Sequence, residues 1–186
     1  NPDTVYGSYL CRGDLSPQHC SICVTNMTQF LELQFVKTND SFQDWYGLTD
    51  ECTIHFANHS IYGLYVKDDV FLPGPADIPG EYSPNMKEIN DSLTNRMDML
   101  ISLASNSSTK FVTSEVDVIG SSDHEKLYVL VQCTPDLSTR NCSACLKEMY
   151  SNFLSCCGGY SEARVIDARC MMKYDNQSFF DTSNAY

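Results

Sequence analysis

The chain has 186 residues, ten cysteines and a formal net charge of -12. This acidic balance argues against binding to nucleic acid or to an anionic membrane through general electrostatics. No run of about 18 apolar residues is present to span a bilayer and no secretory signal stands at the start, so we expect a mature, processed or excised ectodomain.

The first part of the chain is predicted to form a strand near 4–11, a helix near 16–36 and a strand near 50–57. Three prolines then mark residues 61–82 as the end of this unit and a linker. The resulting division of the chain is a first domain at 1–72, a linker at 73–82 and a second domain at 83–186.

The second part begins with Ser83-Pro84, which suit an N-cap and a first helical residue, and apolar residues at helical spacing predict a helix over about 84–104. Residues 110–113 and 126–133 are rich in strand-forming residues, and the turn-forming residues 120–123 lie between them. Two strands therefore follow the helix.

Another cap at Leu137-Ser138-Thr139 begins a second helix, which Gly158-Gly159 end. Cys142, Cys145, Met149 and Phe153 share one stripe of that helix, and residues 163–174 resume strand character. The order predicts an α+β fold, an antiparallel sheet with helices packed on one side.

The cysteines divide the chain into two repeats. Cys11, Cys20 and Cys23 recur as Cys133, Cys142 and Cys145, both spaced C-x8-C-x2-C and 122 residues apart. Cys52 and Cys170 close the two units, and Cys156 and Cys157 remain. About 50 residues before the second motif have no counterpart before the first, so we expect the first domain to lack its N-terminal strand and helix.

An even number of cysteines in recurrent spacing is typical of disulfides formed in an oxidising compartment. Sequons for N-glycosylation point to the same compartment. Six are predicted sites: Asn26, Asn39, Asn58, Asn90, Asn106 and Asn176. A seventh sequon, at Asn141, has Cys142 in its middle position, where a disulfide competes with glycosylation. The sequence therefore predicts a secreted glycoprotein.

The C-x8-C-x2-C motif, with Cys-Thr-Pro-Asp-Leu-Ser at 133–138 and Ser-Cys-Cys-Gly-Gly at 155–159, resembles the plant ginkbilobin-type domain, also called the stress-antifungal or cysteine-rich repeat domain. The tandem form looks most like the ectodomains of cysteine-rich receptor-like kinases. That resemblance implies two α+β domains, each an antiparallel sheet with two helices, the first being N-terminally incomplete here.

The resemblance also implies the disulfides. It pairs Cys11 with Cys20, Cys133 with Cys142, Cys23 with Cys52 and Cys145 with Cys170. The family's third bridge would use Cys157, but its partner is absent between Cys52 and Cys133. Cys156 and Cys157 are then expected to bond to each other, with free or intermolecular thiols as the alternatives.

Zinc binding, redox chemistry and hydrolysis are the alternatives to a disulfide framework. The pairs Cys20/Cys23 and Cys142/Cys145 have the spacing of a zinc or redox site, but the compartment favours disulfides. His19, His55, His59 and His124 accompany no nucleophile motif. We expect no catalytic residue, no metal and no cofactor.

A sugar site is implied by the resemblance, because single-domain antifungal members hold mannose with an asparagine, an arginine and a glutamate. Arg164 stands at the arginine position and Asp175 at the acidic one, while Ala57 occupies the acidic position of repeat one. An arginine fork and a carboxylate can share sugar hydroxyls. The alternative is a structural ion pair between Arg164 and Asp175.

Aromatic residues offer a further recognition surface or ordinary packing: Trp45, Tyr46, Tyr62 and Tyr65. We interpret the chain as a non-catalytic recognition module on the apoplastic face of a plant plasma membrane, the ectodomain of a receptor-like kinase. Its expected partners are an extracellular protein, peptide or glycan ligand and a co-receptor. The alternatives are a secreted mannose-binding antifungal protein and the ectodomain of a plasmodesmata-located protein.

Overall fold

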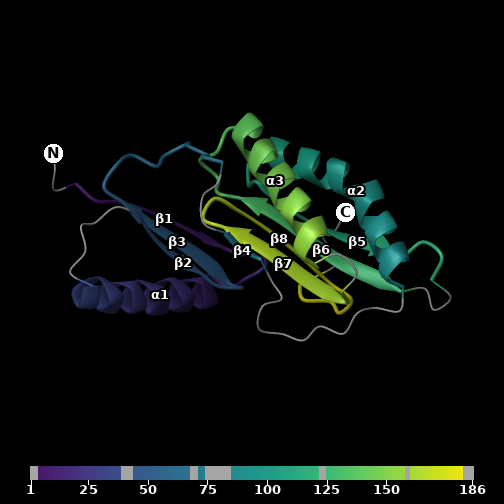
Figure 1. Ribbon diagram of the computed structural model, residues 1–186, viewed down its shortest axis with the longest axis horizontal. Helices are drawn as coiled ribbons and strands as arrows, with labels where there is room; N and C mark the ends of the chain where they lie inside the picture. Colours follow the sequence, from purple (N-terminus) through teal and green to yellow (C-terminus); the bar gives the residue numbers. More distant parts are fainter. Residues whose placement is uncertain are drawn as a thin grey trace.

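The computed structural model describes residues 4–38, 44–67, 71–73, 85–121, 125–157 and 160–181. They form two antiparallel sheets that lie side by side (Figure 1). The first sheet has the order β1-β3-β2, from β1 (Tyr6–Cys11), β3 (Cys52–Ala57) and β2 (Asp44–Leu48). Helix α1 (Pro17–Thr38) packs on this sheet.

The second sheet has the order β4-β7-β8-β6-β5. Its strands are β4 (Phe71–Pro73), β7 (Glu162–Asp167), β8 (Cys170–Asp175), β6 (Lys126–Cys133) and β5 (Phe111–Asp117). Helices α2 (Met86–Asn106) and α3 (Thr139–Cys157) lie together on one face of it (Figure 1). The predicted α+β fold with antiparallel sheets is confirmed.

The two repeats match element by element except at one point. β1, α1, β2 and β3 correspond to β6, α3, β7 and β8. Within the described ranges, repeat one has no counterpart of α2 or β5. The outer edge of β1 is therefore unpaired there, whereas β6 lies between β8 and β5.

The strand predicted over 163–174 is wrong, since this stretch is a hairpin of two strands, β7 and β8. The turn between them carries no glycine or proline. It is held by the Asp167 carboxylate, whose Oδ1 accepts a 2.7 Å hydrogen bond from the Arg169 backbone N–H. Repeat one has the same hairpin, which adds β2 before the strand predicted near 50–57.

The helices lie close to their predicted ranges. α2 begins after Asn85, while Ser83 and Pro84 lie outside the described residues, as do Gly158 and Gly159 at the end of α3. Ser138 caps α3, because its Oγ accepts the Asn141 backbone N–H at 3.1 Å. No helix in the described ranges is both long and apolar enough to cross a membrane.

Five disulfides reinforce the two units. They join Cys11 to Cys20, Cys23 to Cys52, Cys133 to Cys142, Cys145 to Cys170 and Cys156 to Cys157. These are the four pairs that the resemblance implied, together with the vicinal bond that was expected for the remaining two cysteines. In repeat two, all of the bridged sulfurs except that of Cys156 belong to buried residues of the core between helices and sheet.

The chain between the repeats packs on repeat two. We call residues 61–67 the strap. Its Gly63 N–H donates to Asp136 Oδ2 at 2.6 Å, and its Tyr65 hydroxyl donates to Glu148 Oε2 at 2.6 Å. The Gly63 carbonyl accepts from Asn141 Nδ2 at 2.9 Å. The strap thus lies along α3 and β4 along the β7 edge, and β4 ends at Pro73, the first residue of the predicted linker at 73–82.

Candidate functional site

The two sheets meet on the face of the second sheet that α2 and α3 leave open. Alternate residues of a strand point to opposite faces. Val129 and Val131 of β6 join the core under the helices, while Leu130 between them packs with Leu10 of β1 in a second cluster. Repeat one therefore covers part of the open face of repeat two.

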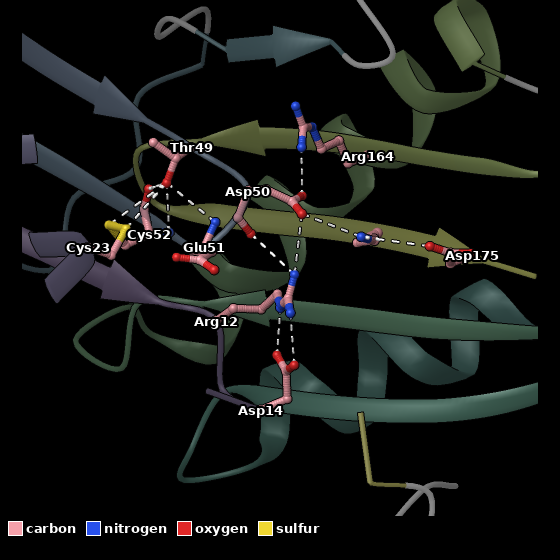
Figure 2. A network of polar contacts seen from close by, with 10 residues as sticks. Arg12, Asp14, Cys23, Thr49, Asp50, Glu51, Cys52, Arg164 and Asp175 are labelled. Carbon is pink, nitrogen blue, oxygen red and sulfur yellow. Dashed lines mark hydrogen bonds and ion pairs between the residues drawn. A yellow bond between two sulfur atoms is a disulfide. The ribbon is translucent and has the colours of Figure 1, made fainter. Parts of the chain in front are cut away.

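Charged side chains join the two repeats beside this apolar contact, and we call them the junction network: Arg12, Asp14, Asp50, Arg164, Lys173 and Asp175. Figure 2 labels all of them except Lys173. Arg12 follows β1 directly and Asp50 lies in the turn before β3, so both come from repeat one. Arg164 and Lys173 are cross-strand partners in β7 and β8. Paired residues of an antiparallel sheet point to the same face, which puts both cations opposite Asp50.

Asp50 is the centre of the network. Its Oδ1 lies 2.9 Å from Arg164 Nη1, and its Oδ2 lies 3.4 Å from both Lys173 Nζ and Arg12 Nη1. Arg12 also donates two hydrogen bonds to the Asp14 carboxylate, from Nε to Oδ1 at 2.7 Å and from Nη2 to Oδ2 at 3.0 Å. One carboxylate of repeat one thus meets two cations of repeat two.

The ring of Phe179, in the segment after β8, lies beside two cations of the junction network. Its ring centroid lies 4.8 Å from Lys173 Nζ and 5.3 Å from Arg12 Cζ. Both cations are within the range where the negative face of an aromatic ring attracts them. The ring also packs against the apolar cluster of Leu10, Leu130, Ile166 and Met171.

Polar bonds to the backbone fix the register of this contact. Gln132, which is buried, accepts the Gly13 N–H at 2.9 Å and donates to the Cys11 carbonyl at 3.1 Å. A Cβ built on Gly13 would lie 2.6 Å from Cδ2 of Phe111, so only glycine allows this approach.

Arg169, in the turn between β7 and β8, makes a second set of polar contacts between the repeats, which we call the second anchor. Arg169 is buried, and its guanidinium donates to the Leu64 carbonyl at 3.1 Å, to Ser8 Oγ at 3.4 Å and to the Asp136 carboxylate. It thereby ties together β1, the strap and the turn before α3. Burial would raise the pKa of Asp136, but the Gly63 N–H and Arg169 more than offset it and the pKa lies below its usual value.

The junction network also moves carboxyl pKa values in opposite directions. Burial would raise the pKa of Asp50, but Lys173, Arg164 and Arg12 together hold it below its usual value. Glu162 lies directly across from Asp175 in the sheet. Burial first, and then the neighbouring Asp175 carboxylate, raise the pKa of Glu162.

These shifts predict a stability maximum in mildly acidic solution. The pKa of Glu162 in the folded chain lies above the usual glutamate value of about 4.3. As the pH falls through this range, the folded chain takes up a proton before the unfolded chain does, so the free energy of unfolding rises. Below about 3.9 the unfolded chain protonates first at Asp50 and Asp136, so stability falls. Urea unfolding across this pH range measures both limbs, and Glu162→Gln should flatten the rise while keeping the fall. An unchanged rise in that variant would contradict the assignment.

The structure places the two residues of the expected sugar site on the same face but gives them different partners. Arg164 pairs with Asp50 of the other repeat, and Asp175 lies 3.8 Å from Lys173 Nζ and opposite Glu162. Asp50 and Arg12 were missed as site residues, because nothing in their local sequence indicates that the repeats meet there.

The other candidate residues lie apart from this junction. Asn26, Asn58, Asn106 and Asn176 are exposed, Asn90 is half-buried and Asn39 lies outside the described residues. Asn141, the seventh sequon, uses its Nδ2 on the Gly63 carbonyl. Tyr62 is exposed, Tyr65 bonds to Glu148, and Tyr46 stacks on His55 with ring centroids 4.4 Å apart.

One cluster in the described ranges has the composition of a metal site: Cys145, Asp167 and Cys170. Its two sulfurs are bonded to each other, so neither is a thiolate that could bind a metal ion. The C-x2-C pairs are likewise divided between disulfides, Cys20 and Cys23 having different partners.

The sequence is similar to a known protein family and to plant proteins of that kind. The salt stress response/antifungal family model matches residues 1–59 and 76–177. The chain is 31% identical over 182 residues to cysteine-rich receptor-like protein kinase 25 of Arabidopsis thaliana, covering 97% of this chain and 26% of the kinase. It is 30% identical over 185 residues to cysteine-rich repeat secretory protein 8 of the same plant, covering 94% of this chain and 63% of that protein. The chain spans between 25% and 64% of the length of eight curated relatives that it matches.

Solved structures show the same arrangement. The tandem DUF26 ectodomain of the Arabidopsis thaliana cysteine-rich receptor-like protein PDLP5 is similar with a TM-score of 0.63 and 25% identity, covering 94% of this chain and 76% of that one. The tandem DUF26 ectodomain of PDLP8 is similar in fold, with a TM-score of 0.61 and coverage of 92% and 72%.

Proposed function

This chain belongs to the salt stress response/antifungal family, and from that premise we propose that it is a non-catalytic extracellular recognition module, the ectodomain of a plant receptor-like kinase. It binds a protein or peptide ligand, or a partner ectodomain, in stress or defence signalling at the apoplastic face of the plasma membrane. The relatives support an extracellular place, because their names are those of secreted proteins and of receptor-like kinases.

The observation that carries the proposal is the pairing of Asp50 with Arg164 and Lys173 across the two repeats. Together with Gln132 and Arg169, these contacts join the two sheets at several points rather than through a flexible linker. A pair of domains fixed in this way presents one composite surface, which suits recognition of a macromolecule.

The same pairing weighs against the mannose-binding alternative. A sugar bound by Arg164 would have to share the guanidinium with Asp50, whose Oδ1 lies 2.9 Å from Nη1. The Asp50 carboxylate carries a full negative charge, so it is a stronger acceptor for the guanidinium than a neutral sugar hydroxyl. We therefore favour a protein or peptide ligand over a glycan.

The test is a binding screen of the secreted, glycosylated protein against two arrays, one of mannose-containing glycans and one of plant receptor ectodomains. We expect binding on the ectodomain array only. Asp50→Ala should weaken that binding, because it removes the carboxylate that orients the repeats. Asp91→Ala is the control, because it removes only an exposed i,i+4 ion pair on α2, and it should leave the binding unchanged. Mannose binding that is lost in Arg164→Ala would overturn the proposal in favour of a lectin.

A further inference from the structure

Helix α1 carries large apolar side chains on its solvent side. Ile22, Phe30 and Leu33 are 59%, 54% and 61% exposed. Residues three or four apart on a helix are neighbours on its surface, so these three form one stripe with Asn26 at its centre, four residues from Ile22 and four from Phe30. Contiguous exposed apolar surface of this kind marks a place where something binds or covers the protein.

The matching positions of α3 are different. The 122-residue offset relates Ile22, Phe30 and Leu33 to Ala144, Asn152 and Ser155, none of which is large and apolar. It relates Asn26 to Glu148. Repeat two therefore has a polar flank where repeat one has an apolar one.

The strap contacts this flank of α3 at two residues, while Ala144 and Ser155 stay exposed. The strap bonds to it at Glu148, through the Tyr65 hydroxyl, and at Asn141, through the Gly63 carbonyl. The exposure of Ile22, Phe30 and Leu33 shows that no described segment covers the same flank of α1. At the position where repeat two has the strap-binding Glu148, repeat one has the sequon Asn26-Met27-Thr28.

We propose that Asn26 carries an N-linked glycan whose first sugars lie along Ile22, Phe30 and Leu33, and that this glycan covers the flank of α1 that corresponds to the strap-contacting flank of α3. A pyranose ring has an apolar C–H face and a polar rim of hydroxyls. The C–H face suits the negative face of the Phe30 ring, and the rim stays in water. The glycan thus converts an apolar stripe into a solvated surface.

The modification precedes folding of the helix. The amide Nδ2 of Asn26 attacks the anomeric carbon of an oligosaccharide held on a lipid pyrophosphate. A C–N bond forms, the bond from that carbon to the phosphate oxygen breaks, and the pyrophosphate leaves with the electron pair as the amide loses one proton. In the folded helix the Thr28 hydroxyl donates to the Val24 carbonyl at 2.8 Å, so the sequon hydroxyl is engaged after folding.

The test begins with glycopeptide mass spectrometry on the protein secreted from plant cells, followed by enzymatic glycan removal from the folded protein. We expect Asn26 to be occupied and the fluorescence of a hydrophobic dye such as ANS to increase when its glycan is removed. Asn26→Gln should give the same increase, whereas Asn176→Gln, which removes another exposed sequon, should not. Adding Phe30→Ser to Asn26→Gln should return the fluorescence toward the wild-type level.

Two further variants separate the glycan from the asparagine itself. Thr28→Ser keeps the sequon and should behave as the wild type, while Thr28→Ala removes it and should behave as Asn26→Gln. An unmodified Asn26, or an occupied Asn26 whose removal leaves dye binding unchanged, would refute the proposal. Dimerisation of the glycosylated wild type that Phe30→Ser abolishes would also refute it, because a second copy would then cover the stripe.

Discussion

Replacing Arg169 by methionine is expected to lower the free energy of unfolding by about 3–5 kcal/mol, the usual cost of removing one partner of a buried ion pair. The Arg169 side chain is 3% exposed, and its loss leaves the Asp136 carboxylate without its cationic partner and the Leu64 carbonyl without the Arg169 Nε–H donor. Methionine keeps most of the side-chain volume, so the change reports mainly on the lost polar contacts. Urea unfolding at neutral pH measures the difference.

Arg140→Met is the matched control, because Arg140 is exposed in the first turn of α3 and should change stability little. The difference between Arg169→Met and the wild type should shrink as the pH falls below about 3.9, where the unfolded Asp136 protonates. The pKa of the folded Asp136 is lowered, so its contribution is present above that pH and lost below it. A loss equal to that of Arg140→Met would show that the second anchor does not stabilise the fold.

Removing the disulfide between Cys145 and Cys170 by changing both to alanine should destabilise repeat two by about 3.5 kcal/mol, the chain-entropy value for this loop. The two residues are separated by 25 positions and both are fully buried. The shorter link between Cys133 and Cys142, with a separation of 9, should contribute about 2.6 kcal/mol by the same rule. Loss of the longer link is therefore expected to be the more damaging.

Denaturant unfolding of the two double variants without reductant gives the comparison. Both pairs of cysteines are buried in the same core, so the loss of packing is similar and the difference reports on loop length. Equal destabilisation by the two changes, or the reverse order, would show that packing or strain outweighs chain entropy here.

The sequence predicted the helices of repeat two well because their apolar residues recur at helical spacing. Met86, Ile89, Leu93 and Met97 lie on one face of α2, and three of them are buried in the core. The β7–β8 hairpin was missed for the opposite reason. Its turn is made by Asp167, Ala168 and Arg169, and an aspartate side chain replaces the glycine or proline by which turns are usually recognised.

The candidate site was foreseeable only in part. Arg164 and Asp175 follow from a resemblance within one repeat, whereas the partner of Arg164 is Asp50, from the other repeat. Contacts between repeats depend on how two folded units pack, and no local pattern encodes that. The glycine at position 13, beside the Phe111 ring, is the one local sign of close approach, and glycine alone is too common to be read in that way.

The position of the strap makes the two repeats depend on their order in the chain. The strap follows repeat one in the chain and bonds to α3 of repeat two. The segment that leads into repeat two therefore contacts the helix of that repeat. In repeat one, the corresponding flank of α1 receives no such cover from the described residues, and Ile22, Phe30 and Leu33 are exposed there. Exchanging the order of the two repeats would therefore not be neutral, since Glu148 and Asn141 would lose the strap while the apolar flank of α1 would gain one.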